Sequence, residues 1–210
     1  MLKIGYLVPA TVIKALPDYT SYLMAIPGTE LMALLERAQA GSRLRVGDNT
    51  IAAVHSLEDG RIHLSQRSAP FYRRLAEMLI SPLLVQGKVK VVHAAAVKGA
   101  DYAKVAVVGL NGCDPVTACL PYVKPEATRP YTDSTITIVK YSTIIEEYVV
   151  NAFAPASKED ILEVIHFKKL EEVHVIVRPG SIGKFLGKGG ANAATVAKLT
   201  GIRVCVRRGS

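Results

Sequence analysis

The first part of the chain consists of short runs of strand-forming residues separated by turn-forming residues. Residues 5–16 and 20–28 are rich in Val, Ile, Leu and Tyr, with a turn-forming Pro-Asp-Tyr between them. A second pair of such runs, residues 44–58 and 61–68, is joined by Asp59-Gly60, a dipeptide typical of tight hairpins. The pattern therefore predicts four short strands.

Residues 29–40 follow a different spacing. Leu31, Leu34 and Leu35 recur at helical intervals and Thr29 is the expected N-cap, so we predict a helix here. Short strands with one helical insertion are typical of small closed barrels. We therefore predict an OB-type β-barrel over residues 1–68.

The middle of the chain, residues 69–155, contains longer periodic segments. Phe71, Leu75, Met78 and Leu79 fall on one face of a predicted helix. The pattern then predicts two strands (88–97 and 102–110), a helix (114–120) and a proline-rich connection (121–134). A further strand (135–141) and a helix (142–156) complete the segment.

Local signals indicate where these helices begin. Asp114 is the expected N-cap of its helix, with Pro115 in the first turn. Ser142 or Thr143 is expected to cap the last helix of the segment. Three prolines in residues 121–134 argue against a helix there.

The last segment, residues 156–210, repeats this order. We predict two strands (161–170 and 171–178), a short helix (179–187), a second helix (191–201) and a final strand (202–208). The order of elements occurs once whole and once in a damaged form, and this repetition supports two related domains.

A glycine-rich loop, Gly187-Lys188-Gly189-Gly190, lies between the two helices of the last segment. In a dinucleotide-binding fold such a loop follows directly on a strand, whereas here Ile182 and Leu186 belong to an intervening helix. A Walker-type loop has Ser or Thr after its Gly-Lys, and neither Gly-Lys pair here is followed by one. The arrangement predicts the GxxG loop of a KH domain, which holds about four unpaired nucleotides.

The residue types of this region suit a sugar-phosphate backbone. Glycines allow close approach, the following helix offers free N–H groups, and Lys184 and Lys188 add positive charge. The predicted RNA-binding residues are Arg178, Ile182, Lys184, Leu186, Gly187, Lys188, Gly189, Gly190, Asn192, Ala194, Arg203 and Val204. The alternative is a plain helix–turn–helix in which the glycines serve only tight packing.

The charge of the chain favours a polyanionic partner. The formal net charge is +8, and residues 156–210 hold ten Lys and Arg against five Asp and Glu. The basic surplus therefore lies on the segment with the glycine loop. A merely solvated basic surface is the alternative explanation of the charge.

Other chemistry is not indicated by the sequence. The five histidines are scattered and the three cysteines lack a CxxC spacing, so no metal site, cofactor or enzymatic activity is predicted. No apolar run approaches the length of a membrane span, and the N-terminus lacks the features of a secretory signal. We expect a reduced, cytoplasmic protein without a membrane partner.

Several stretches resemble the NusA family of bacterial transcription elongation and termination factors. These stretches are the barrel exit RIHLSQRSAPFYRRLAE, the run CDPVTACL, the linker helix YSTIIEEYVVNAFAPA and the segment IGKFLGKGGANAATVAKLTG. The resemblance covers nearly the whole chain in order. It implies an α+β multidomain fold: a ribosomal-S-one-type OB barrel (1–68) followed by two type II KH domains of order α-β-β-α-α-β (69–155 and 156–210).

The resemblance also implies a function and partners. The family binds single-stranded RNA and acts in transcription elongation, termination and antitermination, with RNA polymerase or other transcription factors as partners. In the barrel, Tyr19 and Tyr22 occupy positions where related barrels carry stacking aromatics, although such tyrosines are as often half-buried strand residues. Leu34 stands where RNA-binding barrels of this type commonly carry histidine.

The chain departs from the family pattern in two places. The large N-terminal polymerase-binding domain is not in this sequence, which begins at the barrel. The first KH domain is degenerate, because PYVKPEATRP replaces its GxxG loop, although Lys124 and Arg129 remain there for backbone contact. The alternatives are therefore a truncated paralogue that serves as a protein-interaction module with vestigial RNA binding and, more remotely, a nucleotide-binding enzyme.

Overall fold

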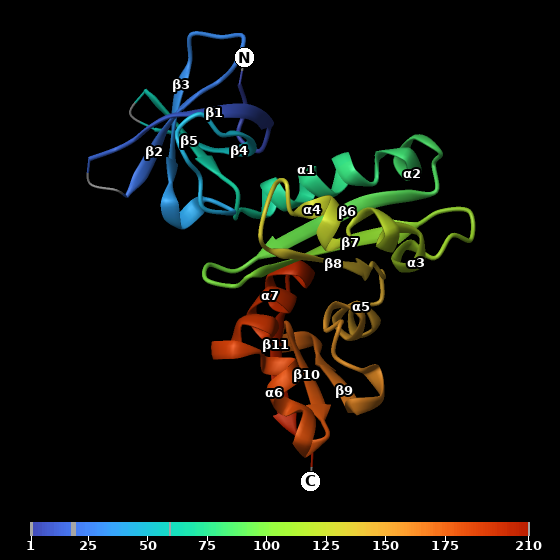
Figure 1. Cartoon of the computed structure of the whole chain (residues 1–210). Coiled ribbons are helices and arrows are strands. Elements are labelled where there is room, and N and C mark those ends of the chain that lie inside the picture. The colour runs from blue at the N-terminus through green and yellow to red at the C-terminus, as the bar shows by residue number, and fades with distance from the viewer. Residues whose placement is uncertain (1, 18–19, 59, 210) are drawn as a thin grey trace.

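The computed structural model describes residues 2–17, 20–58 and 60–209 (Figure 1). The N-terminal part is a closed barrel with strand order β1-β2-β3-β5-β4, in which β3 and β5 are parallel and the other neighbours antiparallel. Its strands are β1 (Leu7–Ala15), β2 (Ser21–Ala25), β3 (Met32–Glu36), β4 (Asn49–Glu58) and β5 (Arg61–Ser65), with a 3₁₀ turn η1 (Arg37–Gln39) after β3. The predicted closed barrel is confirmed.

The helix predicted over residues 29–40 is wrong, because this segment supplies strand β3. Ala33 and Leu35 are buried in the barrel core while Leu34 is only half-buried, so the burial has a period of two. Thr29 does not cap a helix. Its Oγ1 donates to the carbonyl of Ile26 at 2.8 Å and shapes the turn that leads into the strand. Pairing with β2 and β5 closes the barrel and overrides the helical spacing of the leucines.

A second unit follows, built on a three-stranded sheet of order β6-β7-β8. β6 and β7 are antiparallel, while β7 and β8 are parallel. Its elements are α1 (Ala69–Leu79), α2 (Ser81–Val85), β6 (Val89–Ala96), β7 (Tyr102–Gly109), α3 (Pro115–Cys119), η2 (Leu120–Tyr122), α4 (Pro125–Thr128) and β8 (Thr135–Lys140). Asp114 caps α3 as predicted, since its Oδ2 accepts from the amide of Thr117 at 2.9 Å.

The proline-rich connection contains a short helix, contrary to the prediction from its three prolines. α4 begins at Pro125, which occupies a first-turn position where the missing N–H breaks no hydrogen bond. Pro121 likewise lies in the first turn of η2. The prolines therefore mark the starts of short helical turns, and the expectation that they prevent all helix was wrong.

The third unit has the same element order and the same strand directions as the second. Its sheet has the order β9-β10-β11, with β9 and β10 antiparallel and β10 and β11 parallel. Its elements are α5 (Ile145–Ala152), η3 (Lys158–Asp160), β9 (Ile161–Phe167), η4 (Lys168–Leu170), β10 (Glu172–Val177), η5 (Pro179–Ser181), α6 (Ile182–Leu186), η6 (Lys188–Gly190), α7 (Ala191–Thr200) and β11 (Arg203–Arg208).

The N-cap position of α5 is Ile144, neither Ser142 nor Thr143. Ser142 nevertheless supports the helix start, because its Oγ accepts from the amide of Ile144 at 3.1 Å and donates to Glu147 at 2.7 Å. The expected cap was thus misplaced by one or two residues.

The sheet of β6, β7 and β8 is covered on both faces (Figure 1). On β7, Ala103, Val105 and Val107 pack with α1 and α3, whereas Ala106 packs with α5 and α7 of the third unit. The same alternation turns Lys104 toward the third unit, where it is fully buried and donates to the carbonyl of Ala154. This double coverage explains why β6 and β7 are apolar at nearly every position.

The sheet of the third unit is covered on one face. Val173, Val175 and Val177 of β10 lie in a shared core with α5, α6 and α7. Glu172 and His174 alternate with them and therefore lie on the opposite, outer face. No helix in the described part of the chain combines the length and apolarity that crossing a bilayer requires.

Candidate nucleic-acid interface

The glycine-rich loop joins α6 to α7, as the sequence predicted. α6 ends at Leu186 and α7 begins at Ala191. Gly187, Gly189 and Gly190 have φ angles of 71°, 58° and 78°. These values lie in the left-handed region that side chains disfavour, so the sequence of glycines produces the tight reversal between the two helices.

The glycines differ in what surrounds them. A Cβ on Gly187 would lie 2.8 Å from the Cβ of Asn192, so this position is closed by packing. A Cβ on Gly189 or Gly190 would meet no protein atom within 4 Å. The packing explanation of the loop therefore applies to Gly187, while Gly189 and Gly190 present bare backbone to the surroundings.

The backbone amides of the loop are used unequally. Gly187 donates to the carbonyl of Gly183 at 2.8 Å and Gly190 to the carbonyl of Gly187 at 3.1 Å, bonds that stay within the turn. Within the described ranges, no protein group accepts a hydrogen bond from the amides of Lys188 or Gly189. Two adjacent donors thus remain at the exposed tip, where an anion is able to accept from both.

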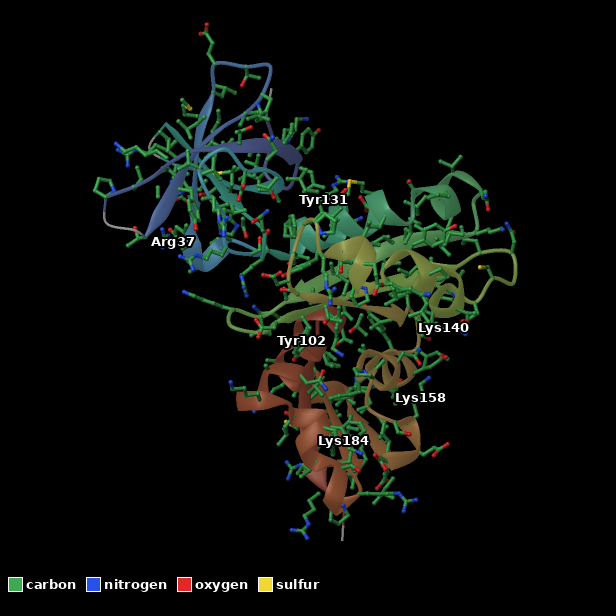
Figure 2. All side chains as sticks on the ribbon, in the orientation of Figure 1. Arg37, Tyr102, Tyr131, Lys140, Lys158 and Lys184 are labelled. Carbon is green, nitrogen blue, oxygen red and sulfur yellow. The ribbon has the colours of Figure 1, made fainter. Side chains whose placement is uncertain are left out.

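Positive charge accompanies this tip. Lys188 is exposed within the loop, and Lys184 extends from α6 with 68% of its side chain exposed (Figure 2). The Nζ of Lys184 lies 3.8 Å from Asp160 Oδ2, a separation at which an exposed ion pair contributes little. Both ammonium groups are therefore available to a phosphate.

Asn192 has a different position from the one predicted. It is only 7% exposed, and its Nδ2 donates to the carbonyl of Lys184 at 3.0 Å. Its side chain also packs against Gly187. Asn192 therefore fixes the loop between the two helices, and its amide is not directed at a ligand.

The predicted apolar lining divides into exposed and packed residues. Ala194 is exposed on α7 and Leu186 is half-buried at the end of α6. Ile182 and Val204 are half-buried and pack against the core of the third unit. Only part of the predicted groove lining is thus free to contact a base.

Arg178 and Arg203 lie at opposite ends of the third sheet. Arg178 follows β10, whereas Arg203 begins β11 beside Glu172, so the length of a strand of about 17–20 Å separates them. The Nε of Arg178 donates to the carbonyl of Glu159 at 3.3 Å. The structure does not bring these two predicted residues together.

Two basic residues at the end of β11 were missed. Arg207 and Arg208 are exposed, and the parallel pairing places Arg208 opposite Val177, next to Arg178. The three arginines therefore lie at the same end of the sheet, with Arg207 and Arg208 on opposite faces of β11. Their basic run is visible in the sequence, but the parallel pairing that brings them to Arg178 is not.

The second unit has no equivalent loop. Between α3 and α4 the chain contains η2 and the residues Val123 and Lys124, with no glycine. Lys124 and Arg129 are exposed there, a condition for any residual contact with a nucleic-acid backbone.

The barrel offers less stacking surface than predicted. Tyr19 lies outside the described residues. Tyr22 is 4% exposed in the barrel core and the guanidinium of Arg37 lies 5.1 Å from the centre of its ring, so Tyr22 is a core residue and not a stacking platform. Leu34, half-buried, lies beside His63 in the parallel β3–β5 pair. A histidine therefore does lie next to the predicted position, contributed by another strand.

Comparison with known proteins supports the family resemblance in part. No protein-family model matches the chain. The transcription termination/antitermination protein NusA of Halalkalibacterium halodurans is 31% identical to it over 154 residues. The match covers 70% of this chain and 38% of that protein, so the chain spans well under half the length of this curated relative. The chain is thus similar to a NusA protein.

Solved structures match parts of the chain at low similarity. The a/eIF2alpha–aDim2p–rRNA complex from Pyrococcus horikoshii shows 17% identity over 41% of this chain and 63% of that chain, with a TM-score of 0.28. APE1850 shows 20% identity over 66% and 97%, with a TM-score of 0.43. A multidomain protein with nucleic acid binding domains from Streptococcus pneumoniae shows 18% over 42% and 34%, with a TM-score of 0.26. Scores below 0.5 do not establish a common fold for the whole chain.

Proposed function

We propose that this chain is a NusA-like RNA-binding protein, and that the loop between α6 and α7 binds the ribose-phosphate backbone of single-stranded RNA. The observation that carries the proposal is the open tip of the loop. Lys188 and Gly189 have amides without a protein acceptor, and a Cβ on Gly189 or Gly190 would meet no protein atom. Exposed Lys184 and Lys188 supply the countercharge.

The domain assignment is part of this proposal. We assign residues 1–68 to an OB-type barrel, 69–155 to a degenerate first KH domain with the linker helix, and 156–210 to an intact second KH domain. The linker helix is α5, which packs in the core of the third unit. The shared order and strand directions of the second and third units support a common origin for them. The second KH domain would read the RNA, with the barrel and first KH domain as a rigid support.

The biological setting follows from the similarity to NusA. We propose a role in transcription elongation, termination or antitermination, with RNA polymerase or another transcription factor as a partner. The +8 net charge is consistent with a nucleic-acid partner.

The test is a charge reversal at the loop tip. Lys188→Asp combined with Gly189→Asp places two carboxylates where phosphates are proposed to lie, and Asp is among the residues that tolerate a left-handed backbone. We expect affinity for a single-stranded RNA of mixed sequence to fall at least about tenfold at constant salt. Fluorescence anisotropy measures the affinity, and circular dichroism checks the fold.

A matched control makes the same change in charge elsewhere in the unit. Lys168→Asp with Leu170→Asp alters exposed residues of η4 and should bind RNA nearly as the wild type does. Equal affinity in the loop variant and the wild type contradicts the proposal. An equal loss in both variants contradicts it too, because it would indicate unspecific attraction to a basic protein.

A protein-interaction module is the second candidate function. Leu110, Val116 and Leu120 are exposed on α3 or within five residues of it in the chain, in the unit that lacks the glycine loop. Exposed apolar side chains in one place are typical of docking surfaces. This candidate is favoured if the wild type shows no RNA affinity above that of the loop variant and binds a specific protein through this surface.

A further inference from the structure

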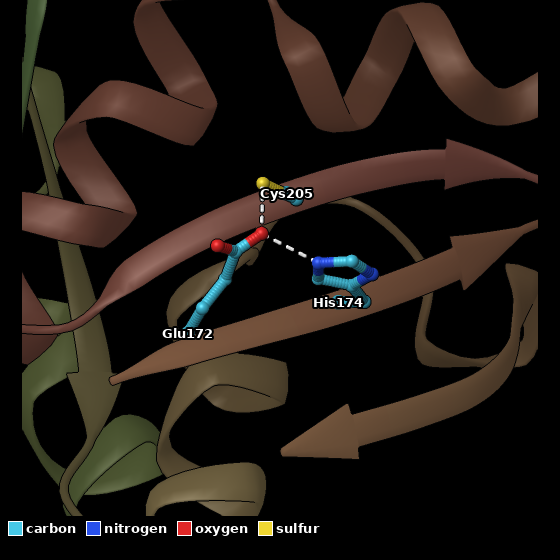
Figure 3. Close-up of side chains that lie close together, drawn as sticks. All are labelled: Glu172, His174 and Cys205. Atoms are coloured by element: carbon cyan, nitrogen blue, oxygen red, sulfur yellow. Dashed lines mark hydrogen bonds and ion pairs between the residues drawn. The ribbon is translucent and has the colours of Figure 1, made fainter. Parts of the chain in front are cut away.

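The outer face of the third sheet carries a cluster of three metal-ligating side chains (Figure 3). Glu172 and His174 are two positions apart on β10 and therefore project from the same face. Cys205 of β11 is the register partner of His174. Two rigid, hydrogen-bonded strands thus hold a carboxylate, an imidazole and a thiol together.

The three groups meet at one oxygen atom. Glu172 Oε1 lies 2.5 Å from His174 Nε2 and accepts a hydrogen bond from Cys205 Sγ at 2.8 Å. The side chains of Glu172 and His174 are only 10% and 15% exposed, although the face they occupy carries no helix. A glutamate that is almost buried at a sheet surface is uncommon unless it is paired or binds a metal.

Neighbouring side chains enclose the cluster. The ring of Phe167 packs edge-on against His174, with 4.7 Å between the ring centres. Arg203 lies on the other side, with its guanidinium nitrogen 3.6 Å from Glu172 Oε2. One carboxylate oxygen therefore faces the thiol and imidazole, and the other faces a cation that holds the carboxylate in place.

The donor set and its spacing suit a zinc ion. The ligand atoms of the three residues all lie within 4.8 Å of one another. In a tetrahedral zinc site, bonds of about 2.0–2.3 Å put neighbouring ligand atoms about 3.3–3.8 Å apart, so only a small outward movement is needed. Carboxylate, imidazole and thiolate are the three common zinc ligands, and thiolate disfavours Mg²⁺ and Ca²⁺.

We propose that Glu172, His174 and Cys205 form a Zn²⁺ site with three protein ligands and one position open to water. The bound ion would link β10 to β11 at the end of the sheet marked by Arg203. The site lies on the face of the sheet opposite to the helices of the RNA-binding proposal, and it stands independently of that proposal.

The competing explanation is a polar cluster that satisfies itself without metal. Glu172 accepts from Cys205 and contacts both His174 and Arg203, so every group already has a partner. The two explanations differ in one testable respect. Only in a metal site do all three side chains contribute to the affinity for zinc.

The experiment uses the full chain without a histidine tag, stripped of metal by a chelator. Zn²⁺ is titrated against a chromophoric competitor, and Co²⁺ is added separately as a spectroscopic substitute. We expect one ion per chain, a sulfur-to-cobalt charge-transfer band, and a melting temperature that rises with added zinc. If the wild type binds no Zn²⁺ in competition with the chromophoric competitor, the proposal is overturned.

Variants identify the ligands. Cys205→Ser and His174→Gln should each weaken zinc binding at least about tenfold, since even loss of an outer partner of a ligand costs that much. Cys113→Ser and His166→Gln are matched controls, because His166 pairs with Glu146 at 2.9 Å without a thiol nearby. Unchanged zinc affinity in the double variant Cys205→Ser, His174→Gln contradicts the assignment.

Two further measurements keep the test decisive. If Cys205→Ser does not fold, the cobalt charge-transfer band of the other proteins still tests the proposal. The band should persist in Cys113→Ser. Absence of the band in the folded wild type contradicts a thiolate ligand. The loop variant Lys188→Asp, Gly189→Asp should bind zinc as the wild type does. Failure of RNA binding is thereby separated from failure of the metal site.

Discussion

At the scale of single residues, the four-residue loop combines two roles. Gly187 lets the chain pass close to Asn192, whose side-chain amide is bonded to the carbonyl of Lys184. Gly189 and Gly190 have no neighbour that requires the absence of a side chain. Support for the loop and contact with a ligand are thus assigned to different glycines, which a substitution experiment is able to separate.

Gly187→Ala should destabilise the protein more than Gly190→Ala. Both substitutions force a side chain into positive φ, at a cost of about 1–2 kcal/mol. Only Gly187→Ala adds a clash, with its Cβ 2.8 Å from the Cβ of Asn192, and overpacking of this kind costs about 1–3 kcal/mol more. Urea unfolding followed by circular dichroism measures both, and equal midpoints in the two variants would contradict the packing role of Gly187.

Residue roles were predictable from the sequence only as far as neighbours in the chain decide them. The exposed loop lysines and the cap at Asp114 depend on local spacing, and the structure places them accordingly. The burial of Tyr22 depends on barrel closure, and the grouping of Arg207 with Arg178 depends on parallel pairing. Both are set by contacts between distant segments, which periodicity does not reveal.

At the scale of elements, the longer periodic segments were predictable and the short ambiguous one was not. Every predicted strand contains an observed strand, because alternation and turn residues agree there. The apolar side chains of residues 29–40 fit both a helical spacing and the alternation of a strand. Pairing with the free edges of β2 and β5 makes this segment a strand. The proline-rich connection was misjudged because prolines begin helices as well as end them.

The lysines of α6 and its loop should determine the salt dependence of RNA binding. Each phosphate neutralised on single-stranded RNA contributes about 0.7 to the slope of log affinity against log salt concentration. Lys184→Gln and Lys188→Gln should therefore each reduce the slope by about 0.7, provided that each lysine contacts one phosphate. Lys198→Gln changes an exposed lysine near the far end of α7 and should leave the slope unchanged. Titrations at several salt concentrations measure the slopes, and an effect of Lys198→Gln equal to that of Lys188→Gln would contradict a localised contact.

At the scale of the whole molecule, the second and third units share a core. Ala106 and Val139 of one sheet pack in the same cluster as Val173 and Val175 of the other. Within the third unit, the hydroxyl of Tyr148 on α5 donates a buried hydrogen bond to the carbonyl of Leu199 on α7, at 3.1 Å. The orientation of the glycine loop relative to the rest of the chain therefore depends on an extensive apolar contact.

Lys104 makes this contact sensitive to pH. Its ammonium is buried between the units, donates to the carbonyl of Ala154 and lies 6.0 Å from the ring centre of Tyr102. Burial lowers the pKa of Lys104 to about 8 from its usual 10.5, because the charged form loses hydration. The unfolded chain then binds more protons than the folded chain between these two values, so the free energy of unfolding should rise with pH across that window.

Comparison with Lys104→Met isolates this effect from other titrations. Below pH 8 both states of the wild type are protonated at Lys104 and the difference between the proteins is constant. Between pH 7 and pH 9.5 the wild type should gain about 1–2 kcal/mol of unfolding free energy relative to the variant, because each pKa unit corresponds to about 1.4 kcal/mol. Chemical denaturation at the two pH values measures the gain, with the exposed Lys90→Met as a control that shows none. Parallel stability curves for the wild type and Lys104→Met would contradict a pKa of Lys104 lowered by burial, and with it the view that a desolvated ammonium group lies between the two units.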